Sequence, residues 1–283
     1  MDYTKDGEGR IFNSDLALER RRADLQVDGI HYRKERAPIG VFEKITVTTK
    51  EGARSIGRPE GIYDTLVLPR LDRLDLGECD DAVECVAREL CTIASARGIF
   101  PDKILVVGLG NRALTPDAVG ALAAEEVIPT LNMKEECPEM FEALECSAIA
   151  TIAPNVSSRS GVESALIVES VVKRLMPTLV VIIDAMAARS PKRLGTTIQF
   201  CDTGIHPGSG VGSHKGALSE RTLGVPTIAI GVPTVIDARL LVEGEDEEEC
   251  IGMLVCPKEI DGIVRAASKI IGGGINQAFG ISY

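Results

Sequence analysis

Four apolar runs of strand length follow one another in the second two-thirds of the chain, and segments with helical spacing separate them. The runs cover residues 104–109, 147–153, 178–183 and 225–233. A continuous apolar run of this length predicts a strand that is buried on both faces, as in a parallel sheet covered by helices. The alternation therefore predicts a doubly wound α/β fold, with a three-layer arrangement in which helices cover both faces of the sheet.

The first hundred residues follow a different pattern. Residues 42–70 alternate between apolar and polar side chains and contain glycine-rich turn signals, which predicts antiparallel strands. Residues 79–97 have apolar positions at helical spacing and are followed by Gly98, which predicts a helix with a glycine C-cap. We therefore expect a single α/β domain, with a β-rich N-terminal extension over 16–100 and an α/β core over 101–283.

Composition excludes several classes of function. The net charge of −11 argues against direct binding to nucleic-acid phosphates or to anionic lipid. No apolar run reaches the ~20 residues that a membrane-spanning helix needs, and the charged N-terminus lacks the apolar segment of a signal peptide. We therefore expect a cytoplasmic protein without a membrane partner. Structural zinc and multi-histidine metal centres are not expected, because the eight cysteines show no CxxC spacing and only three histidines are present.

Two aspartates stand at or near the ends of apolar runs. Asp117 follows the first run in the string Thr-Pro-Asp, and Asp184 closes the third run. A carboxylate at the carboxyl end of a buried parallel strand points into the crevice where open α/β sheets bind their ligands. Asp117 alone is also explained as an acid that stabilises the first turn of a helix, whereas Asp184 is costly to bury without a partner. Together they predict acid–base or metal chemistry.

Two glycine-rich segments add candidates to the site. The stretch over 189–224 exceeds the usual length of a connection, which itself indicates function, and it contains Asp202 and His206 as metal ligands or proton carriers. The turn Gly108-Leu-Gly-Asn111 follows a strand and precedes a predicted helix, as a phosphate-binding turn does. It lacks the third glycine of a dinucleotide motif and precedes Asp117, which would repel a pyrophosphate, so a tight turn is favoured.

Several strings of the chain resemble the germination proteases of spore-forming bacteria. They are VGLGN at 107–111, TPDAVG at 115–120, IDAMAARS at 183–190, TTIQ at 196–199, DTGIHPGSGVG at 202–212 and TLGVPTIAIGVPTVIDA at 222–238. The resemblance implies an endopeptidase that degrades small acid-soluble proteins of the spore core during germination. It also implies a homotetrameric zymogen that is activated by removal of a short N-terminal segment.

The resemblance extends to the site residues. The two aspartates proposed as the family's catalytic pair match Asp117 and Asp184 in their motifs. The family's fold is similar to that of the hydrogenase maturation proteases, which implies a phosphorylase/hydrolase-like α/β sheet. In those enzymes acids and a histidine bind a metal, so by analogy His206 or Asp202 would complete a divalent metal site. An aspartic and a metal-dependent mechanism both stay open, and no cofactor is certain.

We expect Asp117 and Asp184 to face each other across the crevice at the strand ends. One would activate a water molecule as general base, and the other would give its proton to the leaving amide nitrogen. Backbone N–H groups of the glycine loops would stabilise the oxyanion, at Gly108 and Gly110 or at Gly208 and Gly210. The alternative is a non-catalytic protein that binds a nucleotide or phosphate at the Gly108–Asn111 turn.

A segment near the N-terminus has the form of a substrate. Its sequence Asp15-Leu16-Ala-Leu-Glu19 gives an acid, an apolar residue, alanine, any residue and glutamate. The resemblance implies that substrates are cut after an acid in such a setting, so we expect self-processing between Asp15 and Leu16, with residues 1–15 as the propeptide. The same segment is also explained as an ordinary helix start, with Ser14 as the N-cap and acids in the first turn.

Overall fold

The structure of the protein is a computed structural model that describes residues 5–6, 10–11, 14–20, 27–206, 216–242 and 246–280. Gly208 and Gly210, which were predicted as oxyanion donors, lie outside the described residues. In the part that the structure describes, no helix is long and apolar enough to cross a membrane.

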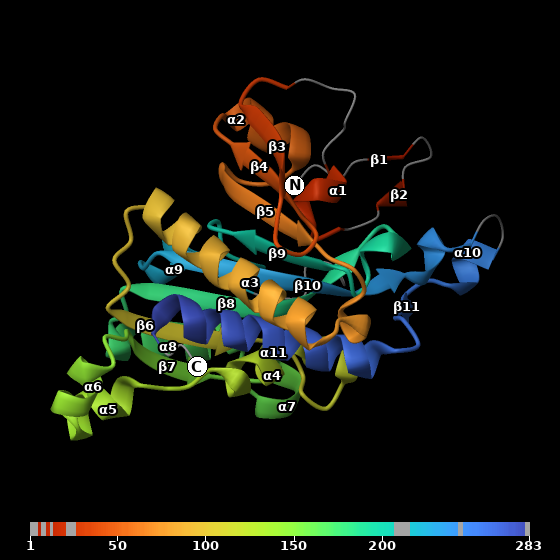
Figure 1. The fold of residues 1–283 in the computed structure, drawn as a ribbon. Helices are drawn as coiled ribbons and strands as arrows, with labels where there is room; N and C mark the ends of the chain where they lie inside the picture. Colours follow the sequence, from red (N-terminus) through yellow and green to blue (C-terminus); the bar gives the residue numbers. More distant parts are fainter. Residues whose placement is uncertain are drawn as a thin grey trace.

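A large mixed sheet runs through the molecule in the strand order β3-β4-β5-β9-β10-β8-β6-β7 (Figure 1). Its second half is parallel, because β10 pairs with β8, β8 with β6 and β6 with β7 in the same direction. The predicted apolar runs form these four strands: β6 (Lys103–Gly108), β7 (Ala148–Ile152), β8 (Leu179–Ala188) and β10 (Thr227–Asp237). The prediction of a parallel core is confirmed.

The first half of the sheet is antiparallel, as predicted for residues 42–70. It consists of β3 (Ile30–Arg36), β4 (Val41–Val47), β5 (Gly61–Val67) and β9 (Thr197–Cys201). Strand β9 pairs with β5 on one side and with β10 on the other, both antiparallel, so it joins the two halves into one sheet. The predicted long loop over 189–224 therefore contains a strand. The short β11 (Leu254–Val255) pairs with β10, and β1 (Lys5–Asp6) pairs with β2 (Arg10–Ile11).

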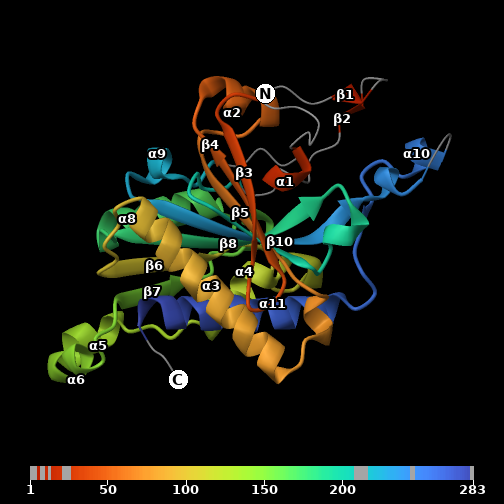
Figure 2. The ribbon, with the colours of Figure 1, turned by 45° about the horizontal axis from the view of Figure 1, so that its top comes forward.

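Helices cover both faces of the sheet, so the three-layer prediction is confirmed (Figures 1 and 2). On one face lie α3 (Leu76–Ala96), α4 (Val119–Glu126) and α11 (Ile260–Phe279), and on the other lies α8 (Ser164–Leu175). Alternate residues of β8 divide between the two cores: Val181 and Ile183 pack toward α3 and α11, while Val180 and Ile182 pack toward α8. This alternation is the two-residue period of a strand.

Helix α11 contains three consecutive glycines, which on sequence grounds mark a weak point. The helix nevertheless runs without a break from Ile260 to Phe279. A Cβ atom at Gly272 would lie 2.4 Å from Glu126 Cβ, and one at Gly274 would lie 2.4 Å from Val86 Cγ1. The glycines therefore let α11 pack closely against α4 and α3 at the same time.

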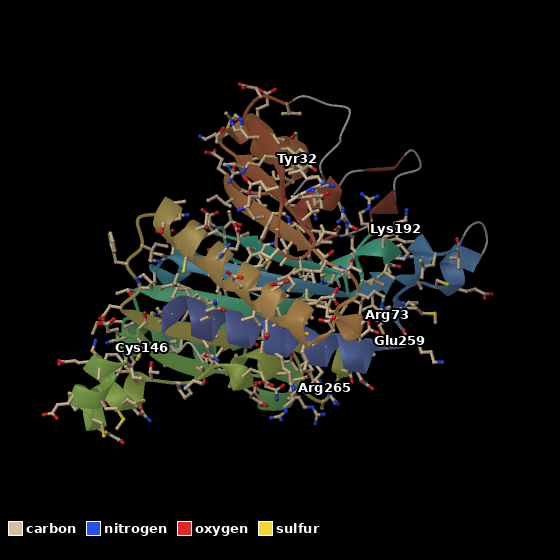
Figure 3. All side chains as sticks on the ribbon, viewed as in Figure 1. Tyr32, Arg73, Cys146, Lys192, Glu259 and Arg265 are labelled. Carbon is tan, nitrogen blue, oxygen red and sulfur yellow. The ribbon has the colours of Figure 1, made fainter. Side chains whose placement is uncertain are left out.

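A side-chain contact joins the start of α11 to the turn that precedes α3. Glu259 accepts a hydrogen bond from Arg70 Nη2 at 3.1 Å, and Arg73 adds a favourable charge nearby (Figure 3). The remaining helices are short: α1 (Ala17–Arg20), α2 (Lys50–Ile56), α5 (Leu131–Glu136), α6 (Pro138–Ala143), α7 (Ser157–Ser160), α9 (Glu220–Leu223) and α10 (Asp246–Glu249).

Candidate active site

Asp117 lies on a turn at the carboxyl end of the parallel strands. The predicted helix start at Thr115 is instead a single 3-10 turn over Thr115–Asp117, and α4 begins at Val119. This turn contacts β8 and β10, and Thr234 of β10 donates a hydrogen bond to the carbonyl oxygen of Pro116 at 2.7 Å. These contacts place the turn that carries Asp117 beside β8, the strand that carries Asp184.

The glycine turn after β6 wraps around Asp117. The backbone N–H of Asn111 donates to Asp117 Oδ2 at 2.8 Å. Gly110 has a φ of +100°, and a Cβ atom there would lie 1.9 Å from the carbonyl oxygen of Asp117. A Cβ atom at Gly108 would lie 2.1 Å from the carbonyl oxygen of Gly120. The turn thus binds a carboxylate of its own chain, which leaves the Asn111 N–H unavailable for a phosphate.

Asp184 lies inside a strand and does not end it. The prediction that the third strand ends with the apolar run at residue 183 is wrong, because β8 continues to Ala188 alongside the extended β10. The small side chains at 185–188 permit this pairing, although the acid interrupts the apolar pattern. The carboxylate is buried, with the residue only 6% exposed, and its Oδ1 accepts from the N–H of Ala185 at 2.9 Å.

Three strands place Asp184 in register with a glutamine. Gly231 of β10 pairs with Asp184 of β8 on one side and with Gln199 of β9 on the other. Because neighbouring strands lie about 4.8 Å apart and paired residues project to the same face, the Cα atoms of Asp184 and Gln199 are separated by roughly 10 Å on one face. The Met186 side chain lies over Gly231, since a Cβ atom there would be 1.9 Å from Met186 Sδ.

The N-terminal segment lies across this row of residues. The N–H of Asp15 donates to the carbonyl oxygen of Ala187 at 3.0 Å. The amide of Gln199 contacts the backbone on both sides of Leu16: its Nε2 donates to the carbonyl oxygen of Asp15 at 3.3 Å, and its Oε1 accepts from the N–H of Ala17 at 2.8 Å. The structure therefore holds the Asp15–Leu16 bond, predicted from sequence as the processing site, beside the strand that carries Asp184.

A small cavity of about 20 Å³ adjoins this peptide segment, and Asp15, Gln199 and His206 are among the residues that line it. A polar cavity of this size holds one water molecule. Burial, followed by the positive charge of Arg58, lowers the pKa of His206 below its usual value. A lowered pKa favours the neutral imidazole, in which one ring nitrogen is a hydrogen-bond acceptor.

Asp202 occupies a different position from His206. Its Oδ1 accepts from the N–H of Ile62 at 2.7 Å, and its Oδ2 pairs with Arg97 Nη1 at 2.8 Å. These contacts tie the end of β9 to β5 and to the residue that follows α3, and they account for the buried carboxylate without a metal. Over the described residues, no group of three His, Cys, Asp or Glu side chains is arranged to hold a metal ion.

Sequence reasoning missed Gln199 and Arg58. Gln199 is only 3% exposed and lies between Ile198 and Phe200, both fully buried. A buried amide is costly unless its polar atoms are bonded, so a glutamine inside an apolar strand was a usable signal. Arg58 follows α2 in a glycine-rich stretch, and its sequence context carries no comparable signal.

Comparisons with known proteins identify relatives of this chain. The family model described as germination protease matches residues 10–245. A germination protease of Clostridium perfringens is 32% identical over 310 aligned residues, covering 94% of each chain. One from Caldanaerobacter subterraneus is 34% identical over 306 residues, covering 94% of this chain and 93% of the relative. One from Bacillus pumilus is 41% identical over 214 residues, covering 75% of this chain and 57% of the relative.

A solved structure is also similar, at 16% sequence identity and a TM-score of 0.35: a NiFe hydrogenase maturation protease, HycI, from Thermococcus kodakarensis. The similarity covers 65% of this chain and 98% of that one. The family model spans most of the chain, and the clostridial and Caldanaerobacter relatives match it along nearly their whole length. The chain therefore belongs to the germination protease family, and it is an endopeptidase that acts in spore germination.

Proposed function

We propose that this endopeptidase initiates the degradation of small acid-soluble spore proteins, and that it is made as a zymogen that cuts itself between Asp15 and Leu16. One observation carries the self-processing: the Asp15 carbonyl oxygen accepts from Gln199 Nε2 at 3.3 Å, and Gln199 is in register with Asp184 across Gly231. The predicted bond is thus presented to the face that carries a predicted catalytic acid.

The proposed reaction is a hydrolysis by the pair Asp117 and Asp184. One carboxylate takes a proton from water as the oxygen attacks the Asp15 carbonyl carbon, and the other acid gives a proton to the departing nitrogen of Leu16. The Gln199 amide polarises the carbonyl and stabilises the developing oxyanion, together with N–H groups of the glycine loops. A neutral His206 beside the cavity is a further proton acceptor in this scheme.

The proposal also covers the propeptide, the location of the enzyme and its oligomeric state. Residues 1–15 form the propeptide and residues 16–283 the mature protein. The substrates are proteins of the spore core, where the enzyme itself would reside as a homotetramer. Support comes from the membership of the germination protease family and from the Asp-Leu-Ala-x-Glu segment, which places a copy of the expected substrate pattern in this chain.

Self-processing of the full chain tests the proposal. Asp117→Asn and Asp184→Asn are each expected to slow cleavage by about 10²- to 10⁴-fold, with Asp102→Asn as the control. Asp102 is a suitable control because its side chain is 70% exposed and forms a surface ion pair with Lys134. The readouts are intact mass, N-terminal sequencing and degradation of an added small acid-soluble spore protein. Wild-type rates in both active-site variants, or a new N-terminus other than Leu16, would refute the proposed pair or the proposed bond.

Exhaustive chelation separates the two mechanisms. A metal-dependent enzyme loses activity on chelation and recovers it when a divalent ion is added back. An aspartic mechanism predicts unchanged rates under the same treatment, with the Asp117→Asn and Asp184→Asn variants still inactive.

A further inference from the structure

The carboxylate of Asp15 has its own binding site. Its Oδ2 accepts from the N–H of Ala187 at 3.0 Å, and its Oδ1 lies 3.9 Å from Arg58 Nη2. The same nitrogen of Arg58 also donates to the carbonyl oxygen of Ser14 at 3.1 Å. The Arg58 and Asp15 side chains are only 19% and 14% exposed. A cation and a backbone donor thus converge on the acid that precedes the predicted cleavage bond.

The carboxylate of Glu19 occupies a second site. Its Oε2 accepts from the N–H of Arg189 at 2.7 Å, and its Oε1 accepts from the N–H of Ser190 at 2.8 Å. Ser14 Oγ donates a further hydrogen bond to Oε2. Two successive backbone donors, one for each oxygen, match a carboxylate better than an amide, which offers only one acceptor oxygen.

The first two residues between the two acids are buried in apolar surroundings that limit the size of their side chains. Leu16 is fully buried in an apolar pocket with Met186, Ala188 and Ile236. Ala17 is also fully buried, in a different cluster that contains Tyr63, so a larger side chain would overpack this position. Leu18, by contrast, is only partly buried. The kind of contact at each position therefore matches the sequence pattern acid, apolar residue, small residue, any residue, glutamate.

We infer that these contacts form the substrate-recognition subsites of the enzyme, with Arg58 and the Ala187 N–H selecting the acid before the cut bond and the N–H groups of Arg189 and Ser190 selecting glutamate four residues after it. The inference rests on the proposed function, because it assigns the same subsites to substrates cut in trans. The substrate class is a peptide with two acids in this spacing, bound so that the residues after the first apolar one form a helical turn, as Ala17–Arg20 do here. Before processing, the chain's own residues 14–19 fill the subsites.

The first experiment measures binding without cleavage. In the full chain carrying Asp184→Asn, hydrogen exchange is followed at the amides of Ala187, Arg189 and Ser190. Adding Glu19→Ala is expected to speed exchange at Arg189 and Ser190 by about 10-fold or more, while Ala187 changes much less. Adding Asp15→Ala should give the opposite pattern. Unchanged exchange at these amides in both variants overturns the inference, whether or not the protein cuts peptides.

The second experiment measures specificity. The processed protein is given a synthetic peptide with the sequence of residues 10–24, and a version that carries Asp15→Asn. Wild type is expected to cut the aspartate peptide with a kcat/KM about 10- to 100-fold higher than the asparagine peptide. The Arg58→Gln enzyme should lose this preference. The control Arg54→Gln, at an exposed position of α2 shortly before Arg58, should keep it.

The outcomes separate the inference from the proposed function. If Arg58→Gln cuts at any rate but keeps the full preference for aspartate, the subsite assignment is wrong while the protease proposal stands. If wild type cuts neither peptide, the proposed function is wrong, and the exchange measurement alone decides whether the subsites exist.

Discussion

A buried cluster of three charged residues predicts how the stability of this fold depends on pH. Lys44 of β4, Asp64 of β5 and Glu89 of α3 are only 6%, 4% and 3% exposed. Lys44 Nζ lies 2.6 Å from Glu89 Oε2 and 3.4 Å from Asp64 Oδ2. Glu35, at the surface, also lies 3.9 Å from this ammonium group. One buried cation therefore faces two buried carboxyl groups.

The imbalance leaves a proton on the cluster. The pKa of Asp64 is raised from 3.8 to about 8, chiefly by burial and also by the neighbouring Glu89, while Lys44 offsets part of the effect. Asp64 Oδ1 and Glu89 Oε1 are buried and have no hydrogen-bond partner among the described residues. A protonated Asp64 leaves one cation and one anion, which is the charge balance that a buried pair requires.

The sign of the effect follows from proton linkage. Between pH 4 and pH 8 the folded protein keeps a proton that the unfolded chain releases, so the free energy of unfolding falls as pH rises. The stabilisation is fully present below about pH 4 and is lost as pH passes 8. The slope is at most about 1.4 kcal/mol per pH unit. From pH 6 to pH 8 the loss is therefore at most about 3 kcal/mol for this group.

In Asp64→Asn the side chain at position 64 is neutral at every pH. The variant should therefore lose this pH dependence of the free energy of unfolding. We expect the variant to gain about 1–3 kcal/mol relative to wild type between pH 6 and pH 8. The assay is urea unfolding at half-unit pH steps, with the exposed Asp102→Asn as control. A difference between Asp64→Asn and wild type that stays constant across this range would refute the assignment of the proton to Asp64.

Two further substitutions test the site's framework. Gly231→Ala places a Cβ atom against Met186 Sδ, so we expect a loss of about 1–3 kcal/mol in the free energy of unfolding together with slower self-processing. A variant with normal stability and normal processing would contradict the close packing of this row. Asp202→Ala leaves Arg97 without its buried partner, and we expect a loss of about 2–4 kcal/mol in urea unfolding. A loss below about 0.5 kcal/mol would show that this ion pair does not brace β9.

The parts of the fold that the sequence predicted are those set by local patterns. The four apolar runs became the parallel strands because a strand buried on both faces needs apolar side chains at every position. The helix over 79–97 appeared as α3, beginning at Leu76 with a capping box between Asp75 and Glu78. These features depend on residues that are neighbours in the chain.

The parts that escaped prediction depend on partners far apart in the chain. Strand β9 is only five residues long and lies in a glycine-rich stretch, but it is fixed by pairing with β5 and β10. The extension of β8 beyond Asp184 depends in the same way on β10. The alignment of Asp184 with Gln199 depends on two pairings, that of β10 with β8 and that of β10 with β9. The sequence pattern of one strand alone therefore does not reveal this alignment.

Under the proposed self-processing, the contacts that present the Asp15–Leu16 bond also keep the zymogen from other substrates. A segment tethered to its own site acts at an effective concentration on the order of millimolar, so a free protein at lower concentration competes poorly. The Asp15–Leu16 bond, which is the proposed cleavage site, is part of this tether. Once that bond is hydrolysed, Ser14 and Asp15 belong to a separate peptide that dilution removes, along with the contacts to Arg58 and Ala187. Leu16 to Glu19 then remain attached through one end only, and the three subsites of Leu16, Ala17 and Glu19 become open to competition from a substrate. In the proposed scheme, presentation and inhibition are thus two consequences of one set of contacts, and cleavage removes part of these contacts and frees one end of the segment.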